Sequence, residues 1–227
     1  MKRIVQIELT NFCNRSCEYC GNRLQTRARG MMSDETVDRC IEVLHQLGQG
    51  HIGLNHFGES LIHPKFVDIC NKLNSENIKP WVYTNSDLIN NEMIDKLLEI
   101  NFESFVLSGH RDQNELIDLW QKMVNKGFKN VWWQRPVKDQ AASLAGQVVL
   151  PYSSDIGQEP LVDPELHCRF LRDEEYIVLW DGKLATCCFD YDDKTVFGTI
   201  YDENCTNLVA KASDMCKGCP GHPENVV

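Results

Sequence analysis

The stretch Cys13-Asn14-Arg15-Ser16-Cys17-Glu18-Tyr19-Cys20 brings three thiols into eight residues, directly after the apolar run Ile4–Leu9. Three thiols cannot fill the four positions of a structural zinc site or of a fully ligated iron–sulfur cube. They can hold three irons of a 4Fe–4S cluster and leave the fourth iron open to a small chelating ligand. A zinc ribbon with a fourth ligand nearby and a chance grouping are the alternatives.

This spacing resembles the signature of the radical S-adenosylmethionine (radical SAM) superfamily, including the aromatic Tyr19 before the third cysteine. The resemblance implies that Cys13, Cys17 and Cys20 ligate a 4Fe–4S cluster and that Tyr19 lies at the cofactor site. The open iron would bind the amino and carboxylate groups of S-adenosylmethionine. One electron would then split this cofactor into methionine and a 5′-deoxyadenosyl radical. A reducing partner such as flavodoxin or ferredoxin is implied as well.

The composition is that of a globular chain with a feasible core. Of its 227 residues, 42% are apolar and 25% are charged, and the formal charge is −10. An acidic chain lacks the broad Lys/Arg surface that binds phosphates, so no nucleic-acid partner is expected. We expect a cytoplasmic protein with no membrane contact, because no apolar run approaches the roughly 20 residues of a membrane helix. Eleven cysteines in such a protein favour metal or cluster ligation over disulfides.

Short apolar runs alternate with stretches of helical period up to about residue 135. This alternation predicts β/α units around a parallel sheet. A closed eight-unit barrel takes about 250 residues, so the barrel should be incomplete. We therefore expect an α/β fold in which residues 1–150 form the partial (β/α)6 TIM-like barrel that the resemblance implies. The expected strands are Ile4–Leu9, His51–His56, Pro80–Thr84, Ser104–Ser108, Asn130–Gln134 and a last one at Gln147–Leu150.

Residues 151–227 are expected to form a linker and a small β-hairpin-plus-helix domain that binds a second cluster. The hairpin would join Glu175–Leu179 to Lys183–Thr186 through Asp181-Gly182. Four thiolates, from Cys168, Cys187, Cys216 and Cys219, suit a tetrahedral zinc or a complete 4Fe–4S cluster.

The pattern Cys-x13-Gly-x4-Cys followed by Cys-x-x-Cys resembles the twitch domain, the shortened SPASM domain of radical SAM enzymes, which holds one auxiliary 4Fe–4S cluster. A zinc knuckle is the alternative. Cys188 or Cys205 could replace an assigned ligand, whereas Cys40 and Cys70 lie on apolar helical stripes and are expected in the core.

The stretch His56-Phe57-Gly58-Glu59-Ser60 resembles the Gly-Gly-Glu-Pro motif of the family, from which Phe57 and Ser60 depart. Gly58 would let the backbone approach the ligand, and Glu59 would accept a hydrogen bond from the cofactor ammonium group. An ordinary strand-end glycine is the plainer interpretation. The polar residues at further strand ends are Thr84, Asn85 and Ser108 as cofactor-binding candidates, and His110 and Arg135 as catalytic ones. The basic loop of Arg23, Arg27 and Arg29 is either solvated or contacts an anionic partner.

The family reaction is hydrogen abstraction from a substrate that the protein binds and orients. A fully ligated auxiliary cluster has no open iron, so it would accept the remaining electron, and net oxidation follows. The resemblance is greatest to the radical SAM dehydrogenases of aminoglycoside biosynthesis, from which we carry over the reaction type and not the substrate. A small-molecule dehydrogenase is therefore favoured. The alternatives are a maturase of a ribosomally made peptide and a non-enzymatic module stapled by zinc or a cluster.

Overall fold

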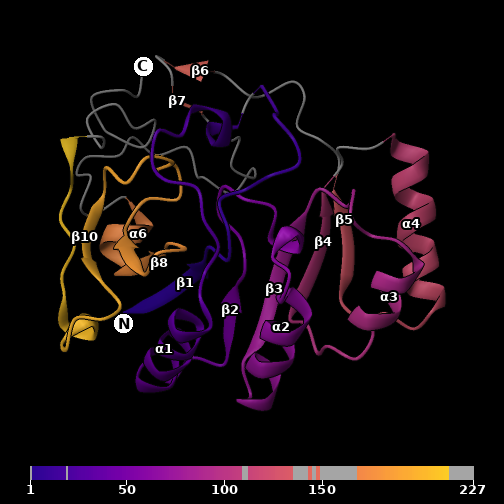
Figure 1. Ribbon diagram of the computed structural model, residues 1–227, viewed down its shortest axis with the longest axis horizontal. Coiled ribbons are helices and arrows are strands. Elements are labelled where there is room, and N and C mark those ends of the chain that lie inside the picture. The colour runs from indigo at the N-terminus through magenta and orange to yellow at the C-terminus, as the bar shows by residue number, and fades with distance from the viewer. Residues whose placement is uncertain are drawn as a thin grey trace.

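The computed structural model describes residues 2–18, 20–108, 112–134 and 168–214, together with residues 143–144 and 147–148. Its main feature is one sheet with the strand order β10-β9-β8-β1-β2-β3-β4-β5 (Figure 1). The N-terminal strands are β1 (Arg3–Ile7), β2 (His51–Gly53), β3 (Lys79–Thr84), β4 (Ser104–Ser108) and β5 (Val131–Gln134). The C-terminal ones are β8 (Glu175–Val178), β9 (Lys183–Ala185) and β10 (Val196–Thr199).

Strands β1 to β5 pair in parallel, each with the next along the chain, as the alternating pattern predicts. The helices between them are α1 (Asp34–Gln46), α2 (Phe66–Ser75), α3 (Asn91–Leu97) and α4 (Gln113–Asn125). All of them cover one face of the sheet, which we call the outer face, and share one apolar core with it (Figure 1). Ser33 caps α1 by accepting a hydrogen bond from the Thr36 amide, and Gly127 adopts a positive φ after α4.

The C-terminal hairpin β8–β9 has the expected turn, where Gly182 adopts a φ of +85°. β8 also pairs in parallel with β1, so the hairpin extends the main sheet. Residues 147–148 do not provide a last barrel strand: Gln147–Val148 is β7, whose partner among the described strands is β6 (Ser143–Leu144). The expected boundary between residues 150 and 151 falls outside the described ranges.

Short helices complete the described chain. They are the 3-10 turns η1 (Gly21–Leu24), η2 (Ser60–Ile62) and η3 (Cys205–Asn207), and α6 (Arg169–Arg172). Phe170 of α6 packs with Ile177 and Leu179 against the sheet face opposite α1 to α4, which we call the inner face. β8 alternates between the two faces, since Val178 belongs to the outer core.

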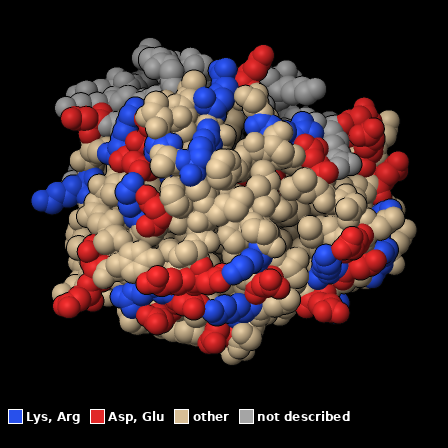
Figure 2. Space-filling model, viewed as in Figure 1, with Lys and Arg blue, Asp and Glu red and all other residues tan. Residues whose placement is uncertain are grey.

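Charges of both signs are mixed over the helices in the view of Figure 2. Lys65 pairs with Asp34 and Lys72 with Asp38, which joins α2 to the first turns of α1. These pairs are exposed, so each contributes little to stability. No helix in the described part of the chain is long and apolar enough to cross a membrane.

Candidate active site

The cysteine loop, residues 13–20, follows β1 and is fastened to the end of β3. The Asn85 amide Nδ2 donates to Asn14 Oδ1 at 2.8 Å and lies 3.9 Å from Cys13 Sγ. The Arg15 guanidinium binds both oxygens of Asp87, each at 2.6 Å. Two parallel bonds from a planar guanidinium fix both distance and direction. The loop is therefore held at the carboxyl ends of the strands.

The three thiols of this loop are free and partly buried. Burial raises the pKa of Cys13, which Glu59 and Cys17 raise further. Burial also raises the pKa of Cys20, and the nearby Cys17 and Cys13 thiols raise it further. The thiols thus lie close enough to repel one another when ionised, and a positively charged cluster would relieve that repulsion. This donor set fits the 4Fe–4S group that the spacing predicts. Among the described residues no three His, Cys, Asp or Glu side chains surround a single metal ion.

Glu59 is buried beside this loop, at the start of η2. Its oxygens accept hydrogen bonds from Thr84 Oγ1 at 2.8 Å and from two backbone amides, those of Asn85 at 2.8 Å and Leu61 at 3.3 Å. Burial raises the pKa of Glu59 despite these bonds. No ion pair to Glu59 occurs within the described ranges. The arrangement orients a carboxylate that a bound ammonium group would stabilise. Glu59, Thr84 and Asn85, three expected cofactor residues, are thus brought together.

Gly58 meets the backbone of the preceding loop. A Cβ at this position would lie 1.8 Å from the Thr10 carbonyl oxygen and 3.0 Å from that of Phe12. The Glu59 amide also donates to the Phe12 carbonyl at 2.8 Å. The structure therefore gives Gly58 a role that the motif did not suggest, which is to let two backbone segments touch.

We expect Gly58→Ala to destabilise the protein by about 2–3 kcal/mol, because the obstructing atoms are backbone and cannot rotate away. Urea unfolding would measure the loss. Gly50→Ala is the matched control, since its nearest neighbour, the Asn77 carbonyl oxygen, lies 3.9 Å from the added Cβ. Equal unfolding midpoints for the two variants would contradict the prediction.

Ser108 ends β4 and is partly buried. The other expected site residues, Tyr19, His110, Arg135, Cys216 and Cys219, lie outside the described residues.

Two of the expected auxiliary ligands are described. Cys168 directly precedes α6, and Cys187 follows β9 by two residues. Cys168 and Cys188 pack against the same small apolar cluster on the inner face. Cys188 therefore stays a candidate for replacing an assigned ligand.

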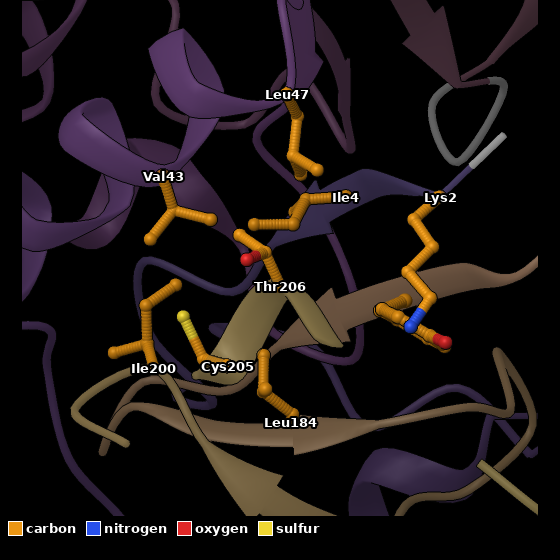
Figure 3. Close-up of a pocket in the computed structure, with 9 residues that line it drawn as sticks. Lys2, Ile4, Val43, Leu47, Leu184, Ile200, Cys205 and Thr206 are labelled. Atoms are coloured by element: carbon orange, nitrogen blue, oxygen red, sulfur yellow. The ribbon is translucent and has the colours of Figure 1, made fainter. Parts of the chain in front are cut away.

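Cys205 does not share this position. It points into a small pocket lined by Ile4, Val43, Leu184 and Ile200 (Figure 3). Its sulfur lies 3.9 Å from the Arg39 guanidinium, and the residue is buried in the outer core. The pocket opens at the start of β1, whereas the cysteine loop lies beyond its end. Cys205 is thus a core residue, as are Cys40 and Cys70.

Sequence reasoning missed a buried group of charges behind the cysteine loop. Arg27 NH2 bonds to Glu8 Oε1 at 2.5 Å, and its side chain and that of Glu8 are 5% and 0% exposed. Arg27 Nε donates to the Tyr191 carbonyl at 3.1 Å, and NH1 lies 3.4 Å from Asp193 Oδ1. The Asp192 carboxylate accepts a hydrogen bond from the Arg27 backbone amide at 3.0 Å. A carboxylate inside the apolar run Ile4–Leu9 was the one signal of this group.

Arg29 also makes hydrogen bonds within the protein: its guanidinium donates to the Asn22 carbonyl at 2.5 Å and to the Asn11 carbonyl. Arg27 and Arg29 therefore have structural roles, although Arg29, like Arg23, is exposed.

Residues 7–134 match the family model described as "Radical SAM superfamily". The chain belongs to this superfamily. The matched range includes the cysteine loop and the Glu59 site, and the membership agrees with the cysteine spacing.

Among curated proteins, the chain is 22% identical to the S-adenosyl-L-methionine-dependent 2-deoxy-scyllo-inosamine dehydrogenase of Niallia circulans, over 95% of this chain and 92% of that one. It is also 22% identical, over 44% of this chain and 29% of the relative, to the tungsten-containing aldehyde ferredoxin oxidoreductase cofactor-modifying protein of Pyrococcus furiosus. Together with the family match, the dehydrogenase relative identifies the chain as a radical SAM enzyme of the oxidoreductase class.

Two solved structures share the fold. BtrN in complex with AdoMet and 2-DOIA superposes with a TM-score of 0.67 at 18% identity, covering 98% of this chain and 89% of that one. SuiB of Streptococcus suis bound to S-adenosylmethionine gives 0.59 at 12% identity, covering 89% and 64%. The parallel sheet with helices on its outer face is thus the radical SAM fold, and the expected α/β class is confirmed.

Proposed function

We propose that this radical SAM enzyme is a dehydrogenase that oxidises an alcohol group of a small molecule, using an auxiliary 4Fe–4S cluster besides the one at Cys13, Cys17 and Cys20. The observation that carries the proposal is the joining of the cysteine loop to the Glu59 site through Asn85. Its support on the substrate side is the similarity to the 2-deoxy-scyllo-inosamine dehydrogenase, which spans nearly the whole of both chains.

Cys13, Cys17 and Cys20 would hold the first cluster at the carboxyl ends of the strands. When bound, this cluster supplies the electron that cleaves S-adenosylmethionine to methionine and a 5′-deoxyadenosyl radical. Glu59 accepts a hydrogen bond from the ammonium group of the cofactor, and Thr84 and Asn85 fix the direction of its carboxylate. Ser108, with Tyr19 in the loop itself, would complete the cofactor contacts.

The auxiliary cluster is proposed to be held in a twitch-type arrangement by Cys168, Cys187, Cys216 and Cys219. Cys188 is the alternative ligand, which could replace one of these four. Such a cluster supplies an acceptor for the electron left on the substrate after hydrogen abstraction. Oxidation of an alcohol also releases a proton, for which His110 is the proposed base. Arg135 stays protonated and is proposed to bind negative charge on the substrate. Flavodoxin or ferredoxin is the proposed electron donor.

Iron content tests the two-cluster assignment. We expect the anaerobically reconstituted protein to hold about eight irons per chain, and Cys168→Ala to hold about four. Parallel Cys187→Ala and Cys188→Ala variants tell which cysteine is the ligand, because only loss of the ligand lowers the iron content. An intact protein with about four irons that Cys168→Ala leaves unchanged would contradict the auxiliary cluster, and bound zinc would support the knuckle instead.

The activity test measures 5′-deoxyadenosine after reduction of the reconstituted protein. Small-metabolite fractions and 2-deoxy-scyllo-inosamine are compared with peptide fractions. Stimulation by small metabolites, with formation of a ketone, is the expected result. Stimulation by peptides alone would establish the maturase in its place, and no cofactor cleavage by cluster-loaded protein would overturn the radical mechanism.

A further inference from the structure

An aromatic row crosses three neighbouring strands on the inner face of the sheet. Val82 of β3 and Leu107 of β4 are fully buried in the outer core. Residues next to them in a strand point to the opposite face, which places Tyr83 and Val106 on the inner face. The strand register pairs Tyr83 with Val106, and Val106 with Trp132 of β5. These three residues therefore form one line across strands that lie side by side (Figure 1).

The two ends of this row are open and its middle is covered. Tyr83 is 42% exposed, Trp132 is 60% exposed and Val106 is 8% exposed. Two exposed aromatic rings on either side of a small apolar residue form an exposed apolar patch, a feature that marks binding sites. The exposed rings are costly to leave in water, so a ligand that covers them gains binding energy.

A second layer supports the row from below. Trp81 lies two residues before Tyr83 on the same face, and their rings meet edge to face with centroids 5.9 Å apart. Trp81 in turn occupies the space that Gly53 leaves on the paired strand, where a Cβ would lie 2.4 Å from the indole. Tyr83 is thus held in place before any ligand arrives, which lowers the entropic cost of binding.

The row lies next to the cofactor site. Thr84 and Asn85, which hold Glu59, directly follow Tyr83 in the chain. Ser108 lies two residues beyond Val106 on the same face, so it is about 7 Å nearer the strand ends. A molecule lying on the row would have its upper edge at the polar strand ends, where the cofactor is bound. Hydrogen abstraction requires that proximity.

We infer that Tyr83, Val106 and Trp132 form the floor of the substrate site, and that the site takes a ring-shaped, polyhydroxylated small molecule. This inference rests on the proposed function and names its substrate class. Such a ring has one face of C–H groups that can stack on the two aromatic side chains. Its hydroxyl groups lie around the edge, where the Tyr83 phenol and the Ser108 hydroxyl can exchange hydrogen bonds with them.

The test compares a ring with its open-chain counterpart. Calorimetry of the cluster-loaded protein with S-adenosylmethionine would use three ring probes, myo-inositol, 2-deoxy-scyllo-inosamine and methyl glucoside. Sorbitol has the same number of carbons and hydroxyls as inositol but no rigid face. We expect at least one ring probe to bind roughly tenfold more tightly than sorbitol, since stacking needs a preformed flat face.

Trp132→Ala should weaken binding of that ring by roughly tenfold and leave sorbitol unaffected, and Trp132→Phe should recover part of the loss. Trp133→Phe is the matched control, because Trp133 packs into the outer core, away from the row. Equal binding of rings and sorbitol, no ring binding, or ring binding indifferent to Trp132→Ala would overturn the inference.

Cofactor cleavage separates this inference from the proposed function. Slow 5′-deoxyadenosine formation without substrate would be measured in the unaltered, cluster-loaded protein, beside its binding of the ring probes. Persistent cleavage without ring binding would overturn the ring site alone. Absence of cleavage in the unaltered protein would overturn the function on which it rests.

Discussion

Arg27→Met is expected to lower the free energy of unfolding by about 3–5 kcal/mol, the largest loss of stability among the substitutions considered. The guanidinium is the partner of Glu8, a carboxylate with no exposed surface. Removing it leaves that charge buried without its ion-pair partner, which costs far more than the pair itself contributes. Urea unfolding followed by circular dichroism would measure the change.

Arg23→Met is the matched control, because Arg23 is an exposed arginine four residues earlier in the chain. It should change stability by less than about 0.5 kcal/mol. The double variant Arg27→Met with Glu8→Gln should lose less than the two single variants together, since the unpaired charge is then absent. Similar losses for Arg27→Met and Arg23→Met would show that the buried pair is unimportant.

This charge group links parts of the chain that local sequence does not relate. Arg27 reaches Glu8 after β1 and also Tyr191 and Asp193 beyond the hairpin. The backbone amide of Thr26 also donates a hydrogen bond to Asp192 Oδ1 at 2.6 Å. The Arg27 variant should therefore loosen both the segment that follows the cysteine loop and the segment that follows Cys188.

The barrel strands were predictable because each β/α unit carries its own apolar period. His51–Gly53, Lys79–Thr84 and Ser104–Ser108 all fall within or beside their expected ranges. The parallel pairing of β8 with β1 was not predictable, since it joins residues about 170 positions apart and no local pattern records such a contact. For the same reason Gln147–Leu150 was wrongly placed as the last barrel strand: its apolar composition suits any sheet, and only pairing decides which.

The site shows the same division. The cysteine spacing and Glu59 were found because their chemistry needs particular residue types at fixed intervals. The Arg15–Asp87 clamp escaped notice because a charged pair 72 positions apart looks like two ordinary surface residues. Gly58 was predicted to let the backbone approach the cofactor. A glycine in the sequence indicates a close approach but not its partner, which in the structure is the backbone of Thr10 and Phe12.

Cys17→Ala is expected to reduce 5′-deoxyadenosine formation at least about a hundredfold, because two remaining thiols cannot hold a cluster that needs three protein ligands. The iron content should fall from about eight to about four per chain, and the residual iron should stay with the C-terminal cysteines. Iron analysis and anaerobic 5′-deoxyadenosine assays would measure both effects on the same sample.

Cys40→Ala separates this effect from a general loss of fold. Cys40 is buried in the outer core, where burial raises its thiol pKa, so it is a packing residue. Its replacement should cost stability through a small cavity and leave the iron content and cofactor cleavage intact. The Cys17 variant should show the reverse pattern, with nearly unchanged unfolding of the cluster-free protein and no cleavage. Undiminished cleavage by Cys17→Ala would show that the cysteine loop does not hold the catalytic cluster, because Cys13 and Cys20 alone cannot supply its three thiolate ligands.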